Sequence, residues 1–212
     1  MTQIAENPIT VERFATGKTW QQYIDSGIRN KELFEDNYNG TVVSSAQAKR
    51  LKGLVERPNG PHHMVVIGED WCPDVYRGTG IAQRIAEAAG IEMRFFERDQ
   101  NKDMIQPYLK DGQFESIPVF VVFDKDNKEI THFIERPKLA NEQIHLTAEV
   151  LGDMTPAGIA TRLGHEPSEE ELAAERAKAR EKYLEWQKGD IWAGWRVATV
   201  DEVSDRIEAA LK

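Results

Sequence analysis

The sequence predicts an α/β fold, because a strand-like run, a helical pattern and further strand-like runs follow one another through the middle of the chain. The run Val65–Ile67 is β-branched and suits a buried strand. Pro73 fits the first position of a helix, where its missing N–H costs nothing, and Gly90 is a natural helix end. The later segments of this pattern are strand-like at 91–97, 116–124 and 129–134 and helical around 104–110.

The only cysteine, Cys72, falls at the start of the predicted helix. Unpaired N–H groups and the helix dipole stabilise an anion at that end, so the position favours a thiolate over a thiol. Asp74 enters the first helical turn, and a carboxylate near the sulfur would repel a thiolate. The sequence therefore predicts a site suited to a reactive sulfur and leaves the balance between these two effects open.

Two motifs give the chain a resemblance to the thioredoxin superfamily. They are Glu69–Asp74, which contains Trp-Cys-Pro, and Ser116–Phe120, which contains Ile-Pro. More narrowly, the first motif and the helical extensions resemble bacterial thioredoxin-like proteins with one active-site cysteine. The resemblance covers residues 61–137 and implies a three-layer α/β/α core with N- and C-terminal helical extensions.

The resemblance also implies the residues of a site. The peptide bond before Pro118 would be cis, because a cis peptide bond costs little free energy only before proline. The loop that contains Ile117 and Pro118 would face Cys72. Trp71 would flank the sulfur as part of the substrate surface. With Cys72 as the catalytic residue, the predicted substrate-binding residues are Trp71, Pro73, Asp74, Ile117 and Pro118.

The chain departs from the family pattern at two positions. Thioredoxins carry a second, resolving cysteine three residues after the first, and that position here is Val75. They also carry a buried acid five residues before the tryptophan, and that position here is Val66. The sequence therefore predicts that no internal disulfide forms and that the usual proton relay is missing.

Composition favours some classes of partner and disfavours others. The chain has 212 residues, of which 40% are hydrophobic and 30% charged, and its net charge is −9. That charge disfavours nucleic acid or an anionic membrane surface as the main partner. The sequence shows no apolar run approaching a membrane span and no basic start followed by an apolar stretch. With a single cysteine, these observations predict a cytoplasmic protein.

The predicted domain organisation is an N-terminal helical extension at 1–60, the core at 61–137 and a C-terminal helical extension at 138–212. The N-terminal helices are expected to pack on the core sheet, and Trp192 and Trp195 are expected to anchor the last helix. Four capping-box patterns predict helix starts, at Thr19, Ser44, Ser168 and Thr199.

No metal or phosphate site is predicted. His62 and His63 make no ligand set by themselves, the other histidines lack metal spacing, and solvated histidines are expected. Gly78 and Gly80 lie inside the predicted helix without the lysine and spacing of a phosphate loop, so we expect them to allow close packing or a kink.

Three functions are compatible with these residues. In the first, Cys72 attacks a protein or small-molecule disulfide or oxidised thiol, and an external thiol such as glutathione resolves the mixed disulfide. In the second, the domain is a redox-inactive binding or adaptor module that keeps the groove, as Val66 and Val75 suggest. In the third, Cys72 is a small buried residue in a protein with a structural role. The sequence does not indicate a bound cofactor or an oligomeric state.

Overall fold

The structure, a computed structural model, describes residues 7–212 and forms two compact units. The first unit comprises the described residues up to Arg136 together with Arg196–Lys212, and the second comprises Pro137–Trp195. The first unit contains the sheet, and the predicted α/β fold is confirmed there.

The sheet has four strands in the order β2-β1-β3-β4. β1 pairs in parallel with β2 and antiparallel with β3, and β3 pairs antiparallel with β4. Every residue of β1 and β3 is buried, as expected for apolar strands covered on both faces. The strands are β1 His63–Gly68, β2 Glu92–Glu97, β3 Val119–Phe123 and β4 Glu129–Ile134.

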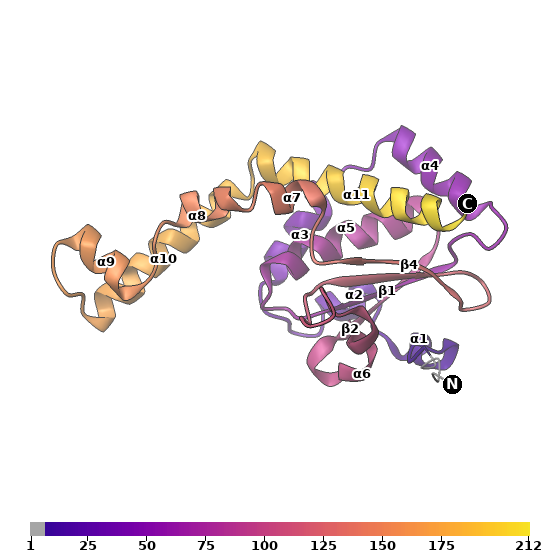
Figure 1. Cartoon of the computed structure of the whole chain (residues 1–212), viewed down its shortest axis with the longest axis horizontal. Helices are drawn as coiled ribbons and strands as arrows, with labels where there is room; N and C mark the ends of the chain where they lie inside the picture. Colours follow the sequence, from indigo (N-terminus) through magenta and orange to yellow (C-terminus); the bar gives the residue numbers. More distant parts are fainter. Residues whose placement is uncertain (1–6) are drawn as a thin grey trace. The chain divides into compact units, whose positions relative to one another are not determined.

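The helix predicted after β1 is α5, Pro73–Ala89. Cys72 is its N-cap residue, Pro73 occupies the first turn, and Gly90 ends it in the left-handed region with φ 78°. α5 contacts β1 and β2, and also α3 (Lys31–Gly40) and α4 (Ser45–Val55). Figure 1 shows α5 running along the sheet with α3 near one end and α4 near the other.

The two glycines inside α5 allow close packing, as predicted. A Cβ atom at Gly78 would lie 2.8 Å from Cγ of Pro118, and one at Gly80 would lie 2.6 Å from the backbone nitrogen of Tyr38. Backbone cannot move away as easily as the end of a flexible side chain can. Gly80 therefore sets the close approach of α5 to α3.

We expect Gly80→Ala to lower the free energy of unfolding by about 1–3 kcal/mol, the usual cost of overpacking. Gly53 provides the matched control, because it lies in α4 and no neighbouring atom lies within 4 Å of a Cβ built there. Gly53→Ala is expected to stabilise the protein by up to about 1 kcal/mol through helix propensity. Urea denaturation of both variants measures the difference; equal effects would show that α5 and α3 can move apart at no cost.

The N-terminal helices were only partly predictable. α2 and α4 begin at the expected capping boxes of Thr19 and Ser44, whereas α3 was not anticipated. The N-cap of α3, Asn30, is left-handed and makes no side-chain capping bond, so the usual start signal is absent. The remaining elements of this part are α1 Val11–Thr16, α2 Trp20–Ile24, and, between β2 and β3, η1 Arg98–Gln100, α6 Lys102–Ile105 and η2 Gln106–Tyr108.

The second unit is helical. Ser168 caps α10 as predicted, and Thr155 caps α9. Trp192 and Trp195 are buried in this unit, with their ring centroids 5.2 Å apart. The helices are α7 Lys138–Glu142, α8 His145–Leu151, α9 Pro156–Leu163, α10 Glu169–Trp186 and α11 Asp190–Ala210, the last continuing along the chain into the first unit.

The predicted helix start at Thr199 is wrong. α11 is continuous from Asp190 to Ala210, so Thr199 lies in its interior and is fully buried. Its hydroxyl accepts a hydrogen bond from Nη1 of Arg77 at 3.4 Å. The capping pattern is local, whereas the role of this threonine comes from its tertiary partner.

The prediction of solvated histidines is wrong for His63. The first residue of β1 is 6% exposed, its ring stacks on Phe123 at 5.1 Å, and its Nε2 lies 2.9 Å from Oδ1 of Asn127. Within residues 7–212 no group of three or more His, Cys, Asp or Glu side chains is placed to hold a metal ion.

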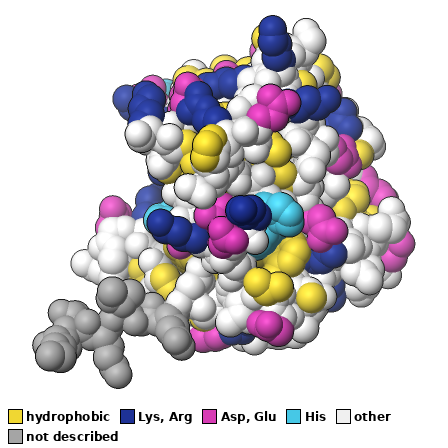
Figure 2. Space-filling view, turned by 90° about the vertical axis from the view of Figure 1, so that its right-hand side faces the viewer, with side chains coloured by type: hydrophobic (Ala, Val, Ile, Leu, Met, Phe, Trp, Pro, Cys, Tyr) yellow, Lys and Arg dark blue, Asp and Glu magenta, His cyan; other side chains and the backbone are white. Residues whose placement is uncertain are grey.

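The described helices include none that is both long and apolar enough to span a bilayer. On the face shown in Figure 2, Lys and Arg side chains are interspersed with Asp and Glu side chains. The charged side chains visible on that face therefore do not form one extended region of a single charge.

Candidate functional site

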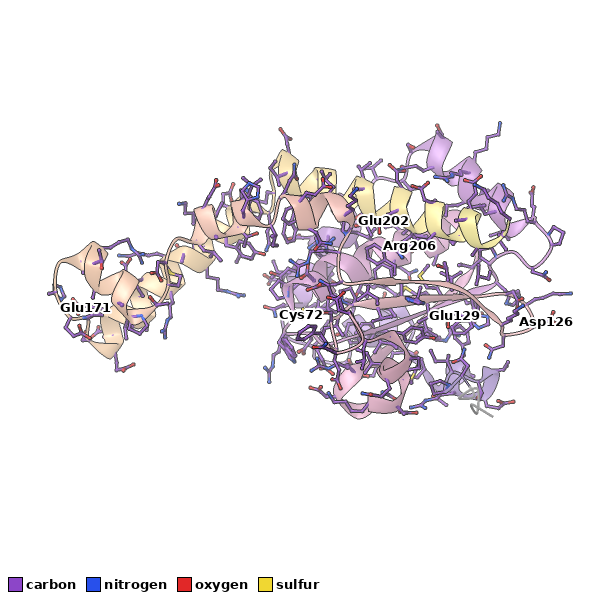
Figure 3. All side chains as sticks on the ribbon, viewed as in Figure 1. Cys72, Asp126, Glu129, Glu171, Glu202 and Arg206 are labelled. Atoms are coloured by element: carbon purple, nitrogen blue, oxygen red, sulfur yellow. The ribbon has the colours of Figure 1, made fainter. Side chains whose placement is uncertain are left out.

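The cysteine and the Ile-Pro loop meet at one end of the sheet. Cys72 is partly exposed, and its Sγ lies 3.8 Å from the carbonyl oxygen of Ile117. The peptide bond between Ile117 and Pro118 is cis. Figure 3 shows Cys72 at the end of the sheet opposite Asp126, which lies in the β3–β4 turn. The structure thus brings Cys72 together with Ile117 and Pro118, although Ile117 lies 45 residues further along the chain.

Trp71 and Pro73, on either side of Cys72, are exposed. The Trp71 side chain is 47% exposed even though the guanidinium of Arg98 lies 5.5 Å from its ring centroid. A large aromatic side chain left open beside a sulfur provides an apolar surface for a bound molecule.

Asp74, the last predicted binding residue, is held by two arginines. Its Oδ1 accepts a hydrogen bond from Nη2 of Arg77 at 3.0 Å, and its Oδ2 lies 3.1 Å from Nη2 of Arg136. Arg77 is fully buried and also donates to the carbonyl oxygen of Glu135 at 3.1 Å. Asp74 is therefore part of an internal ion-pair network and does not point freely into solvent.

Sequence reasoning missed the partners of Asp74. The carboxylate of Glu135 forms ion pairs with Arg136 and Lys110, and all three come from segments distant from Cys72 in the sequence. Only Arg77 carried a signal, because it is a charged residue among the apolar positions of α5. Burial favours the neutral form of Glu135, but hydrogen bonds from Lys110 and Arg136 outweigh it and keep its pKa below the ordinary value.

The thiol of Cys72 has a raised pKa. Burial is the main cause, and the charges of Asp74 and Glu135 act in the same direction. Hydrogen bonds from the backbone of Val75 and Asp74 lower the pKa but do not compensate. The helix start therefore favours the thiolate, as expected, yet the protonated thiol predominates at neutral pH.

The two positions that depart from the thioredoxin pattern are both apolar and fully buried. Val66 lies in β1 and Val75 in the first turn of α5, each with no exposed surface. A Cβ at Gly68 would lie 2.6 Å from Cγ1 of Val75, so this side chain fills the space between α5 and the end of β1. The site therefore has one sulfur and no buried acid at position 66.

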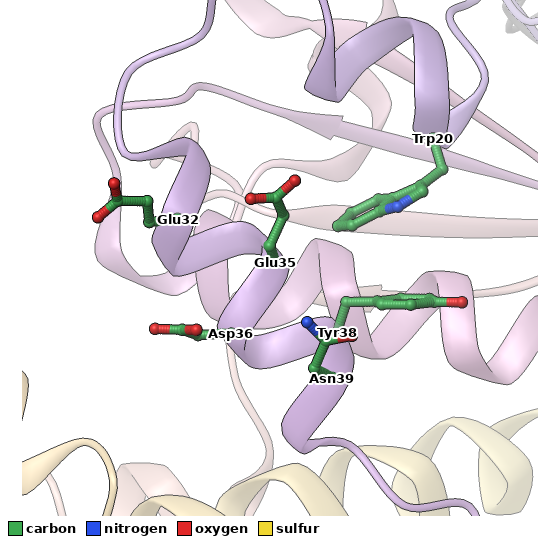
Figure 4. A pocket seen from close by; sticks show the side chains of 6 residues that line it. All are labelled: Trp20, Glu32, Glu35, Asp36, Tyr38 and Asn39. Atoms are coloured by element: carbon green, nitrogen blue, oxygen red, sulfur yellow. The ribbon is translucent and has the colours of Figure 1, made fainter.

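A separate cavity of about 330 Å³ lies beside α2 and α3 in the first unit (Figure 4). The rings of Trp20 and Tyr38 stack there with centroids 5.1 Å apart. None of the residues predicted for the sulfur site lines it. Its lining residues are Trp20, Glu32, Glu35, Asp36, Tyr38 and Asn39.

Comparisons with known proteins agree with this architecture. A family model described as thioredoxin matches residues 17–150. The crystal structure of a protein of unknown function from Pseudomonas aeruginosa is similar at 16% identity and a TM-score of 0.59, covering 95% of this chain and 99% of that one. An HIV epitope scaffold is similar at 18% identity and a TM-score of 0.56, covering 93% and 96% of the two chains. The comparison with curated proteins finds no match. At these identities the structural similarity concerns the fold alone.

Proposed function

Because the chain belongs to the thioredoxin family, we propose that it carries out thiol–disulfide exchange through Cys72 as a monothiol, with an external thiol completing the cycle. The observation that carries this proposal is the position of the sulfur. It lies at the N-cap of α5, partly exposed, 3.8 Å from the carbonyl oxygen that precedes the cis-proline.

The proposed reaction has two exchange steps. The Cys72 thiolate attacks one sulfur of a substrate disulfide, a mixed disulfide forms, and the other substrate sulfur leaves as a thiolate. The thiolate of glutathione or a similar thiol then attacks the mixed disulfide, which releases Cys72 as a thiolate and leaves the oxidised pair outside the protein. Buried Val75 supplies no second sulfur, so the second step requires the external thiol.

The proposed substrate surface consists of the exposed side chains beside the sulfur and the cis-proline loop. Trp71 and Pro73 are exposed, whereas Ile117 and Pro118 are buried and the carbonyl oxygen of Ile117 lies 3.8 Å from Sγ of Cys72. An extended substrate, protein or small molecule, would contact the aromatic ring and pair with the backbone around Ile117.

We expect Cys72→Ser to reduce glutathione-dependent reduction of a small disulfide, such as hydroxyethyl disulfide, about tenfold, to the rate of glutathione alone, because serine is a far weaker nucleophile. Reduction is followed on the full chain, and intact mass after exposure to the disulfide reports the mixed disulfide. Equal rates for the wild type and Cys72→Ser would contradict the proposal. Thr79→Ser, which changes another residue of α5, is the control for a general effect on folding.

A second candidate function is a redox-inactive binding module, favoured by the apolar residues Val66 and Val75 and by the raised pKa of the Cys72 thiol. In that case the surface beside Trp71 and the Ile117 loop would bind a partner without forming a covalent bond. Equal retention of the same partners by the wild type and Cys72→Ala, together with no mixed disulfide, would support this function over exchange.

A further inference from the structure

Arg136 leaves the sheet directly beside the cis-proline loop. Glu135, the residue before it, donates its backbone N–H to the carbonyl oxygen of Pro118 at 2.7 Å. The neighbouring carbonyl of Ile117 lies 3.8 Å from Sγ of Cys72. These two contacts connect the backbone of Glu135, the residue next to Arg136, to the end of the sheet where the sulfur lies.

The guanidinium of Arg136 is held in place by two carboxylates. Its Nη2 lies 3.1 Å from Oδ2 of Asp74, it also pairs with Glu135, and its side chain is only 16% exposed. A planar fork held at two points loses little further freedom when it interacts with a third anion. Burial acts to lower the pKa of Arg136, but the charges of Asp74, Glu135 and the Cys72 thiolate outweigh it and raise the pKa.

Ion pairs surround the sulfur site. They join the cations Lys110, Arg77 and Arg136 to the carboxylates Asp74 and Glu135. A thiolate at Cys72 would add a further negative charge to this group, and that charge acts on Arg136. Two further arginines lie around these ion pairs. Arg98 lies over Trp71 and pairs with Asp99 and Glu115, and Arg196 of α11 is affected by the charge of Arg77.

We propose that Arg136 is a positioning residue for the sulfur: its guanidinium, fixed by Asp74 and Glu135, stabilises the Cys72 thiolate that attacks the disulfide. The inference rests on the proposed function, because it assigns a role in the first exchange step. It explains how a sulfur that lies beside two carboxylates and lacks the usual buried acid would still supply a thiolate for attack.

The test is the pH dependence of Cys72 alkylation by iodoacetamide on the full chain, followed by intact mass. At a pH below the thiol pKa, we expect Arg136→Gln to react about tenfold more slowly, because losing an opposite charge raises a thiol pKa by about one unit or more. Arg136→Lys keeps the charge and should react within about threefold of the wild type. Arg94→Gln is the matched control, because Arg94 is 20% exposed and paired with Glu92 on β2, and its profile should not change.

A folded Arg136→Gln protein with the wild-type alkylation profile would overturn the inference. If that variant does not melt cooperatively, Arg136→Met keeps the apolar stem and should show the same slowing. Glutathione-dependent reduction separates the two proposals. If the wild type does not reduce the disulfide but Arg136→Gln is alkylated more slowly than the wild type, only the exchange function is refuted. If the wild type reduces the disulfide but Arg136→Gln has the wild-type alkylation profile, only the role of Arg136 is refuted.

Discussion

Arg77→Met is expected to lower the free energy of unfolding by about 3 kcal/mol, the lower end of the range for breaking a buried ion pair. Arg77 is fully buried and bridges three segments through Asp74, the carbonyl of Glu135 and the hydroxyl of Thr199. Methionine keeps most of the apolar volume but removes the hydrogen bonds that Arg77 donates to Glu135 and Thr199. The cost stays at the lower end because Asp74 keeps Arg136 as a partner.

Urea denaturation of the full chain measures this change. Arg84→Met is the matched control, because Arg84 lies on the same helix and pairs with Glu87 but is 38% exposed, so the expected cost is at most about 1 kcal/mol. If Arg77→Met destabilised the protein no more than Arg84→Met, Arg77 would not be the residue that joins α5, the end of β4 and α11.

The elements predicted correctly are those whose signals are local. The β-branched run of β1, Pro73 and Gly90 define the first strand and α5 without any tertiary contact, and α5 begins and ends where they predict. α3 lacks such signals, since its N-cap residue, Asn30, makes no side-chain capping hydrogen bond. Its tyrosine Tyr38 packs where Gly80 of α5 leaves space, so its helical form depends on tertiary packing.

The same distinction applies to the site. The sequence motifs placed Cys72, Ile117 and Pro118 correctly beside one another, because a family pattern already contains their spatial relation. Arg136 could not be found this way, because it lies on a different segment and its role depends on the distance to Asp74. The raised pKa of the thiol was also unpredictable, since burial is its main cause and burial depends on the packed structure.

Val75→Cys is expected to change the outcome of the proposed exchange reaction. Val75 is buried three residues after Cys72, so the variant contains a Cys-X-X-Cys motif, the spacing of dithiol oxidoreductases. When the reduced wild type meets oxidised glutathione, the reaction should stop at the mixed disulfide. In the variant the new thiolate attacks the Cys72 sulfur of that mixed disulfide, an internal disulfide forms, and the second glutathione leaves as a thiol. We expect the mixed disulfide to be resolved at least about a hundredfold faster in the variant than in the wild type, because the resolving sulfur is held beside its target.

Intact mass at successive times distinguishes these outcomes, because the mixed disulfide retains one glutathione and the internal disulfide retains none. Val121→Cys is the matched control: it adds a thiol at another fully buried valine, in the middle of β3, where it cannot reach Cys72. The loss of one methyl group should cost each variant about 1 kcal/mol, so both remain comparable to the wild type in stability. A folded Val75→Cys protein that accumulates the mixed disulfide as the wild type does would mean that the first turn of α5 does not present position 75 to the sulfur. Fast resolution would mean that the thioredoxin geometry is intact here and that the missing cysteine alone makes this protein depend on an external thiol.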